Sequence, residues 1–293
     1  MRRRDATGRY MPTPHAVRDS ILSAYLSGAS AGAVSLALGV TKSNAWRLAR
    51  DAGVLRSQSV NQRRYLCDDH FFDVIDTEEK AYWLGFLAAD GCVESPRGAM
   101  KAATGISLHL AETDREHLGR FTRAIQFDGP IYEKPPQRYA EYVGQARCLA
   151  RVTSEQMAAA LIGHGVVPRK TAVLRFPTTV PERLLRHFIR GYFDGDGCWH
   201  TGTYGYWSPS FELLGTSHFL EGCRQLMLRD VPLTSRAMAY DVGKRHIRRL
   251  AFAGARQTGR IYRWIYADAT VWMPRKRNKI APHFGDAQLG LDV

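Results

Sequence analysis

The chain of 293 residues contains nearly the same eleven-residue phrase twice. The first copy, YWLGFLAADGC, occupies residues 82–92, and the second, FIRGYFDGDGC, occupies residues 188–198. The same offset of 106 residues (188 − 82) joins the tripeptide PRK at 168–170 to its second copy at 274–276. A period this long indicates a duplicated half-domain, because the units of solenoid proteins have only about 20–50 residues.

The composition is that of a basic globular protein. Hydrophobic residues make up 45% of the chain, which is enough for a substantial core, and the formal net charge is +13. Clustered lysine and arginine side chains bind polyanions by displacing counterions from phosphates. The charge therefore favours a nucleic acid partner, and we expect double-stranded DNA, although ribosomal and membrane-surface proteins share such a charge.

Cysteine usage and the apolar segments indicate the compartment. The five cysteines form no C-x-x-C pair and are odd in number, which argues against a disulfide framework and a zinc site. No stretch is long and apolar enough to span a bilayer, and the basic first residues lack the apolar run of a signal peptide. We expect an intracellular, cytoplasmic protein without membrane contact, in a bacterial host or a phage-infected cell.

Changes in composition and periodicity divide the chain into segments. The expected order is a basic arm at 1–16, a helix-turn-helix domain at 17–56, a linker at 57–75, two half-domains at 76–175 and 176–284, and a tail at 285–293. Phe71 and Phe72, at the end of the linker, are expected to dock on the next domain.

Three short helices between residues 17 and 56 describe a helix-turn-helix unit, whose third helix enters the major groove of DNA. Gly39 is placed to end the second helix, and Thr41 is placed to cap the third. The stretch resembles the helix-turn-helix of resolvases and transposases, while the alternative is a small bundle for protein contacts. The outer face of the third helix, expected to contact DNA, would carry Lys42, Ser43, Asn44, Arg47 and Arg50.

Each half-domain shows the same order of periodicities: helix, strands, helix, strands, helix. In the first half Ile106, Leu108 and Leu110 alternate as in a half-buried strand, and in the second half Phe211 and Leu213 do the same. The expected class is α+β with antiparallel strands.

The repeated phrases predict two helices that pack against each other. Gly85 and Gly191 would let the two backbones approach closely about a pseudo-twofold axis, which brings Asp90 and Asp196 together at one end. Two carboxylates near helix C-termini repel each other and the helix dipoles. Divalent metal ions offset that repulsion and activate water for phosphodiester hydrolysis. Asp194 lies two residues before Asp196 and would point elsewhere.

These residues resemble those of a known family. WLGFLAADG and IRGYFDGDG resemble the two signature helices of the LAGLIDADG homing endonucleases in their single-chain form, over roughly residues 70–280. The resemblance implies a pseudo-twofold duplicated (αββαββα)₂ domain with antiparallel saddle-shaped sheets that read DNA in the major groove. It also implies that Asp90 and Asp196, with the carbonyls of Ala89 and Gly195, bind Mg²⁺ or Mn²⁺. Ala88 departs from the family motif but leaves the metal-binding position intact.

The twin PRK tripeptides add basic residues to this interpretation. Lys170 and Lys276 resemble family residues that stabilise the phosphoryl transition state or position the water, and the alternative is that they contact the DNA backbone. The run after the second tripeptide is consistent with phosphate contacts that fix register. Its expected phosphate-binding residues are Arg275, Arg277 and Lys279.

The sequence therefore predicts a metal-dependent, site-specific double-strand DNA endonuclease that acts as a monomer with internal pseudo-twofold symmetry. The alternative is a regulator of transcription or an RNA-splicing maturase that kept the fold and lost cleavage. The presence of both carboxylates favours the nuclease, because a non-cleaving relative can dispense with them.

Overall fold

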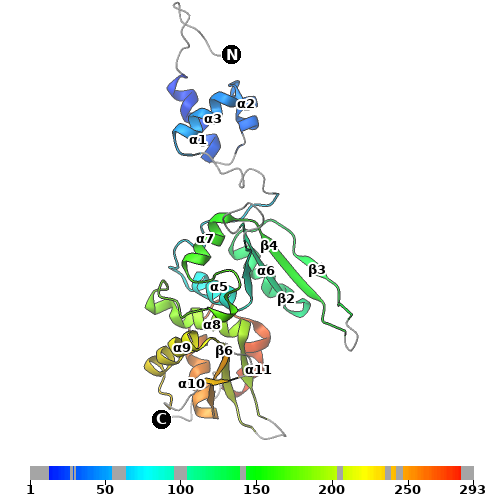
Figure 1. The fold of residues 1–293 in the computed structure, drawn as a ribbon, viewed down its shortest axis with the longest axis vertical. Coiled ribbons are helices and arrows are strands. Elements are labelled where there is room, and N and C mark those ends of the chain that lie inside the picture. Colours follow the sequence, from blue (N-terminus) through cyan, green and yellow to red (C-terminus); the bar gives the residue numbers. More distant parts are fainter. Residues whose placement is uncertain are drawn as a thin grey trace, which may run out of the picture. The chain divides into compact units, whose positions relative to one another are not determined.

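The computed structural model of the protein consists of two compact units, Met1–Arg64 and Tyr65–Val293 (Figure 1). The residues described are 13–26, 29, 31–54, 64–95, 104–138, 143–202, 207–234, 239–241 and 247–284. The division between the units falls inside the predicted linker. Most of the predicted arm and the whole predicted tail lie outside the described residues. No described helix is both long enough and apolar enough to cross a membrane.

The smaller unit contains three helices, α1 (His15–Leu26), α2 (Ala31–Leu38) and α3 (Lys42–Asp51). Gly39 follows α2 with a φ of +63°, which suits glycine, and the Thr41 side chain accepts a hydrogen bond from the first turn of α3. Both predicted signals are thus confirmed. The core of the unit consists of Ile21, Tyr25, Val34, Ala45 and Ala49.

The larger unit repeats one order of elements. The first half contains α5 (Glu78–Ala89), β1 (Gly91–Val93), β2 (Ile106–Ala111), α6 (Arg115–Ala124), β3 (Tyr132–Lys134), β4 (Arg147–Val152) and α7 (Glu155–Gly163). The second contains α8 (Leu185–Asp196), β5 (Gly197–His200), β6 (Ser210–Gly215), α9 (Ser217–Asp230), β7 (Ala239–Asp241), β8 (Arg248–Ala253) and α10 (Ala255–Tyr266). The αββαββα order expected for each half is confirmed.

The two halves differ after their last shared helix. The second copy of the PRK tripeptide begins a further helix, α11 (Pro274–Phe284), whereas the first copy leads only into a short 3₁₀ turn, Lys170–Ala172. Other 3₁₀ turns lie at Glu112–Asp114 and Glu182–Leu184.

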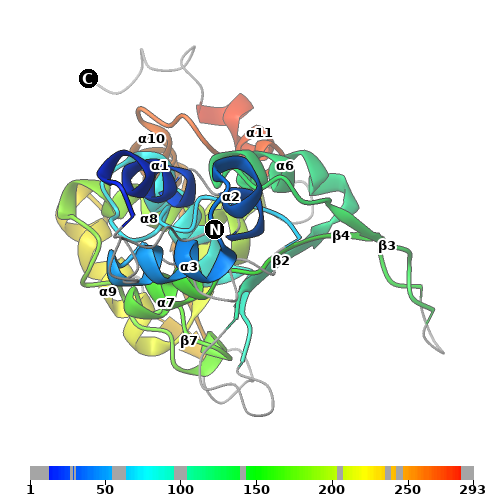
Figure 2. The ribbon, with the colours of Figure 1, turned by 90° about the horizontal axis from the view of Figure 1, so that it is seen from above.

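Each half forms a four-stranded antiparallel sheet, ordered β1-β2-β4-β3 and β5-β6-β8-β7. Figure 2 shows β2, β4 and β3 of the first sheet. Gly91 pairs with Leu108 in the first sheet, and Gly197 pairs with Leu213 in the second. Equivalent residues are therefore 106 positions apart at the glycines and 105 positions apart in β2 and β6. The segment between the paired strands is one residue shorter in the second half, and the strand register is the same in both halves.

The sheets bury one face, as strict alternation requires. Ile106, Leu108 and Leu110 are buried, as are Phe211 and Leu213, so the predicted strand faces are confirmed. The strand register assigns these residues to the outer face of the first sheet: Cys92, Ser107, His109, Tyr132, Lys134, Arg147, Leu149 and Arg151. The outer face of the second sheet carries Cys198, His200, Ser210, Glu212, Leu214, Arg249 and Ala251.

Helices α5 and α8 lie side by side where the two halves meet (Figure 1). A Cβ atom on Gly85 would clash with the backbone carbonyl of Phe188, and one on Gly191 would clash with that of Tyr82. These contacts are related by the repeat, since Tyr82 and Phe188 are 106 residues apart. The glycines thus place the two helix backbones in direct contact about a pseudo-twofold axis, as predicted.

The segment before α5 belongs to the larger unit. Phe71, Phe72 and Ile75 are buried in its core, so the expected docking of the two phenylalanines is confirmed. The predicted linker therefore ends earlier than residue 75, because its last residues are packed.

Candidate functional site

The repeated aspartates lie at the ends of the two central helices. Asp90 caps the C-terminus of α5, and Asp196 is the last residue of α8. The two chain segments touch here: a Cβ atom built on Gly195 would meet Ala89 and would lie 3.3 Å from Oδ2 of Asp90. The close approach set by Gly85 and Gly191 therefore brings the end of each helix against the other, as the sequence predicts.

The surrounding protein makes ionisation of both acids less favourable than in water. Burial raises the pKa of Asp90 to about 6, with a further contribution from the charge of Asp196, while Lys276 and Lys170 oppose the shift. Burial also raises the pKa of Asp196, against the effect of the same two lysines. Both side chains nevertheless reach solvent. In the part of the chain that the structure describes, no group donates a hydrogen bond to either carboxylate.

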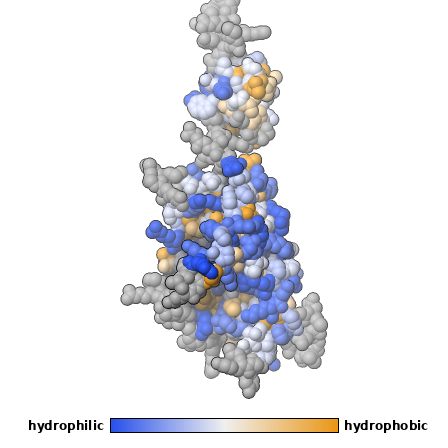
Figure 3. All heavy atoms as spheres, turned by 90° about the vertical axis from the view of Figure 1, so that its right-hand side faces the viewer, coloured by the Kyte–Doolittle hydropathy of each residue, from blue (hydrophilic) through white to orange (hydrophobic). Residues whose placement is uncertain are grey.

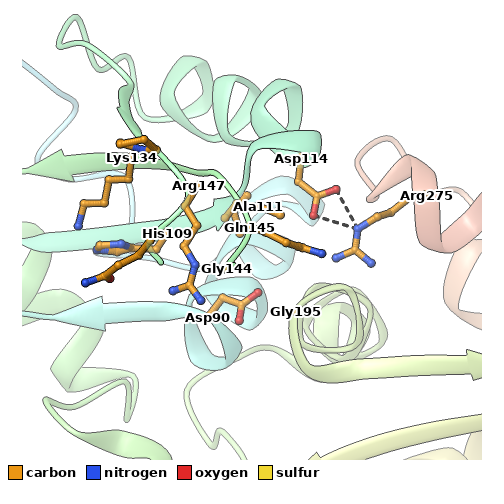
Figure 4. Close-up of a pocket in the computed structure, with 13 residues that line it drawn as sticks. Asp90, His109, Ala111, Asp114, Lys134, Gly144, Gln145, Arg147, Gly195 and Arg275 are labelled. Atoms are coloured by element: carbon orange, nitrogen blue, oxygen red, sulfur yellow. Dashed lines mark hydrogen bonds and ion pairs between the residues drawn. The ribbon is translucent and has the colours of Figure 1, made fainter. Parts of the chain in front are cut away.

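Each aspartate opens into a cavity of its own. The cavity of Asp90 has a volume of about 620 Å³, and that of Asp196 has about 520 Å³. Polar side chains dominate the first, shown in Figure 4: His109, Asp114, Lys134, Gln145, Arg147 and Arg275. The second is lined by Ala88, Lys170, Leu174, Tyr192, His200, Glu212, Leu214, Ile247 and Arg249, among others.

The two cavities are built from equivalent backbone positions with different side chains. His109 and Leu110 line the first cavity, and Leu214 and Gly215 take their places 105 residues later. In the first cavity Arg147 lies opposite Ala111 in the pairing of β2 with β4. The strand register of the second sheet places Ile247, which lines the second cavity, at the position that matches Arg147. The duplication therefore produced two sites of the same construction, of which that of Asp90 is the more cationic.

The twin lysines bind the ends of the central helices. Lys170 is buried and its Nζ donates to the carbonyl of Gly91, just after α5. Lys276 is also buried and donates to Phe193, Gly195 and Gly197 at 2.8, 2.9 and 2.6 Å. Burial lowers the pKa of Lys276 to about 8. Both ammonium groups thus serve as C-terminal caps, and the roles expected for them in catalysis or at the DNA backbone stay predictions.

One of these bonds concerns an expected metal ligand. The carbonyl of Gly195, which the family resemblance assigns to a metal ion, accepts a hydrogen bond from Lys276. No bond to the carbonyl of Ala89 is seen among the described residues. The equivalent carbonyls of the two halves therefore differ in their surroundings.

The basic residues of α11 make contacts within the protein. Arg275 donates through Nε to both carboxylate oxygens of Asp114, at 2.8 and 2.9 Å. The guanidinium of Arg277 lies over the ring of Trp272, 4.3 Å from its centroid. Lys279 donates to the carbonyl of Trp199. Arg275 remains half exposed, whereas Arg277 is more covered. Of these two arginines, Arg275 is therefore the more accessible to a phosphate group.

Asp194 lies away from the paired acids, as predicted, but it is more than a bystander. It is fully buried, accepts hydrogen bonds from the Tyr82 hydroxyl and the Met273 amide at 2.7 Å each, and has its pKa raised by burial to about 6. Tyr82 also contacts His117. This network was not predictable from the repeat, since the repeat partner of Asp194 is Ala88.

Helix α3 of the smaller unit exposes most of the residues expected on its outer face. Lys42, Ser43, Arg47 and Arg50 are exposed, but Asn44 is buried and donates to Thr13, so its assignment to the outer face was wrong. The helical repeat turns residue 44 inward beside Ala45. Trp46, which was not among the expected residues, is also exposed, at 47%.

The donor set at the paired acids is small. Among the described residues, no group of three or more histidine, cysteine, aspartate or glutamate side chains is arranged to hold a metal ion. Any ion here would rest on the two aspartates, backbone carbonyls and oxygens from water or a ligand, which is a coordination pattern typical of Mg²⁺.

Comparisons with known proteins give matches among solved structures. No protein-family profile and no curated protein matches the sequence. Similar solved structures are those of homing endonucleases. They include I-WcaI bound to its DNA recognition sequence (11% identity, TM-score 0.49, covering 70% of this chain and 87% of that chain). They also include meganuclease I-SmaMI bound to uncleaveable DNA (12%, 0.45, 69% and 89%) and the LAGLIDADG enzyme I-LtrWI bound to target DNA (8%, 0.45, 72% and 88%). Because the identities are 8–12% and the TM-scores are below 0.5, the roles of residues in those proteins are not transferred to this chain.

Proposed function

We propose that the larger unit is a metal-dependent, site-specific endonuclease of double-stranded DNA, in which Asp90 and Asp196 hold the metal ions. The observation that carries the proposal is the pair of aspartates at the ends of α5 and α8. They are brought together by backbone contact, lack hydrogen-bond donors among the described residues, and each line a cavity.

The residues present fit a divalent cation. The charged forms of Asp90 and Asp196 are disfavoured by burial and, at Asp90, also by the charge of its partner. A divalent cation held by these carboxylates would offset that effect. Mg²⁺ keeps several waters and accepts phosphate oxygens, so it needs only one or two carboxylates. When bound, such ions activate water and stabilise the leaving oxygen in phosphodiester hydrolysis.

The protein's own side chains would bind and orient the DNA. The outer face of the first sheet presents Lys134, Arg147 and Arg151, and that of the second presents Arg249 beside Glu212. Arginine reads guanine in the major groove, and carboxylates accept from the amino group of cytosine. Figure 3 shows that the side of the larger unit from which β3 and β4 project is mainly hydrophilic, which suits a polyanionic ligand.

The smaller unit would extend the contact with DNA through α3. Lys42, Arg47 and Arg50 lie on its exposed side, and a second module on the same chain raises the effective concentration of both. Deleting residues 1–64 should weaken binding to the target and leave the cleavage position unchanged. Unchanged affinity would assign this unit to a different partner.

Cleavage of a randomised library of DNA duplexes in Mg²⁺, with the break ends sequenced, tests the proposal. We expect discrete double-strand breaks at one site, and their loss in Asp90→Asn and in Asp196→Asn. Asp194→Asn is the matched control, because it neutralises a carboxylate in the same helix that lies outside the cavities. Salt-sensitive binding without breaks in the wild type would instead support a non-cleaving regulator or a maturase.

A further inference from the structure

An ion pair joins the two halves at the edge of the Asp90 cavity. Arg275, the second residue of α11, donates through Nε to both oxygens of Asp114, which lies in the turn that follows β2. The Asp114 side chain is only 7% exposed, whereas that of Arg275 is 54% exposed. The carboxylate therefore holds one edge of the guanidinium and leaves the other edge accessible.

The accessible edge of Arg275 belongs to the cavity. Arg275 lines it together with Asp90 and Gly195, and Figure 4 shows the guanidinium directed toward Gly195, across from the Asp90 carboxylate. No described residue bonds the two Nη nitrogens. A guanidinium held at Nε with two free Nη groups matches the geometry of phosphate recognition.

Among the described residues, the Asp196 cavity is lined by a different pair, Arg249 with Glu212 at 3.5 Å, which joins two strands of one sheet and not the two halves. The repeat relates Arg275 to Arg169, which is exposed but does not line that cavity. The same repeat, with the offset of 105 found in the strands, relates Asp114 to Phe219, whose side chain is buried in the core. The ion pair therefore distinguishes two sites whose terminal aspartates are otherwise equivalent.

We propose that Asp114 positions Arg275 to bind the scissile phosphate of the DNA strand at the Asp90 cavity, so that the enzyme cuts its two strands at unequal rates. The inference rests on the proposed nuclease function. A cation fixed in advance by protein contacts stabilises the charge that develops on the phosphate without reorganising during the reaction. Arg275 contacts the substrate in this scheme, and Asp114 acts through Arg275.

Strand-resolved cleavage tests the proposal. The probe is a duplex that carries the site cut by the wild type, with a different dye on each strand, and single-turnover rates are measured for both strands in Mg²⁺. Arg275→Ala should slow one strand by roughly 100-fold, the usual effect of removing one such donor, while the other strand changes little. Asp114→Asn should slow the same strand by a smaller factor.

Arg169→Ala is the matched control, because it removes the arginine at the equivalent position of the other half. We expect it to leave the rates of both strands unchanged. Equal slowing of both strands by Arg275→Ala would overturn the inference and identify a general structural effect. A wild type that cuts no duplex would overturn the nuclease itself, which is a separate and recognisable failure.

A binding measurement gives a readout that is independent of turnover. In Ca²⁺, a methylphosphonate at the scissile position of one strand removes the charge that Arg275 would bind. The wild type should lose roughly 10-fold in affinity for that duplex, as expected for one charge-assisted contact, and Arg275→Ala should lose almost nothing. An equal loss in both proteins would show that Arg275 does not contact this phosphate.

Discussion

The two central helices share their glycines and their terminal acids but differ in what they bury. Helix α5 carries Leu84 and Ala88 at positions where α8, 106 residues later, carries Arg190 and Asp194. All four side chains are buried. The backbone contact between the halves is therefore symmetric, while the chemistry around it is not.

The buried polar groups of α8 anchor the segment that leads into α11. Arg190 donates to the carbonyls of Ile265 and Val271 at 2.9 and 3.0 Å and pairs with Glu78, and Asp194 accepts from the amide of Met273. The first half has no helix that corresponds to α11. Both halves thus keep the glycines that the backbone contact requires. The other buried positions of the two helices differ, and in α8 they hold the segment before α11 by hydrogen bonds.

The largest effect should come from the element that the two helices share. Gly85→Ala and Gly191→Ala should each reduce the free energy of unfolding by roughly 3 kcal/mol, since a methyl group at either position meets backbone of the other half. Urea denaturation of each variant measures this. Gly163→Ala in α7, where a Cβ atom meets nothing within 4 Å, is the control and should be nearly neutral. Unequal losses of stability in the two variants would show that the contact is symmetric in geometry but not in energy.

Asp194→Ala converts a feature of α8 into its counterpart in α5. It should destabilise the larger unit by about 2 kcal/mol, because the Met273 amide and the Tyr82 hydroxyl both lose a buried acceptor. The free energy of unfolding, again from urea denaturation, is the measurement. Asp194→Asn keeps one carbonyl acceptor and should cost less. A neutral result for both variants would mean that the polar support of α8 contributes no stability.

Substitution of Lys170 and Lys276 compares the stability of the two helix ends. Lys276→Met should cost about 2 kcal/mol and Lys170→Met about 1 kcal/mol, since Lys276 bonds three carbonyls and Lys170 bonds one. Methionine preserves the length of the side chain and removes the donor. Equal losses in parallel urea titrations would show that the number of carbonyls bound does not set the strength of the cap.

The smallest effect concerns the acids themselves and has the opposite sign. The folded-state pKa of Asp90 is about 6, above its ordinary value of 3.8, so the folded protein binds the proton more tightly and loses stability as pH rises between these values. Without metal, Asp90→Asn should therefore stabilise the protein at neutral pH by about 1 kcal/mol, after discounting a two-unit shift for solvent screening.

Unfolding measured at several pH values checks the sign of that effect. The gain from Asp90→Asn should vanish below a pH of about 4, where the unfolded carboxyl is protonated as well. Asp196→Asn should act in the same direction, since burial also raises the pKa of Asp196. A variant that is less stable than the wild type at neutral pH would show that the carboxylate has a favourable partner in the fold.

Features that follow from local sequence were predictable. The exposed side of α3 was largely identified by helical spacing, and the strand faces by alternation. Asn44 was misplaced because an amide side chain was treated as surface by its chemistry, although it shares the inward side of the helix with Ala45. The contact of Arg275 with Asp114 joins residues 161 positions apart. The position related to Asp114 holds Phe219, so neither the repeat nor any motif revealed this contact.

The sequence by itself determined the duplication, the order of elements in each half, the glycines of the helix contact and the two aspartates at its end. These features are readable because each is a local requirement of the backbone and is written twice. Only the tertiary structure decided that the twin lysines cap helices, that Asp194 anchors the segment before α11, and that Arg275 lines the Asp90 cavity while bonded to Asp114. Those roles depend on which distant groups share a buried or partly buried space, and packing, not sequence spacing, determines that.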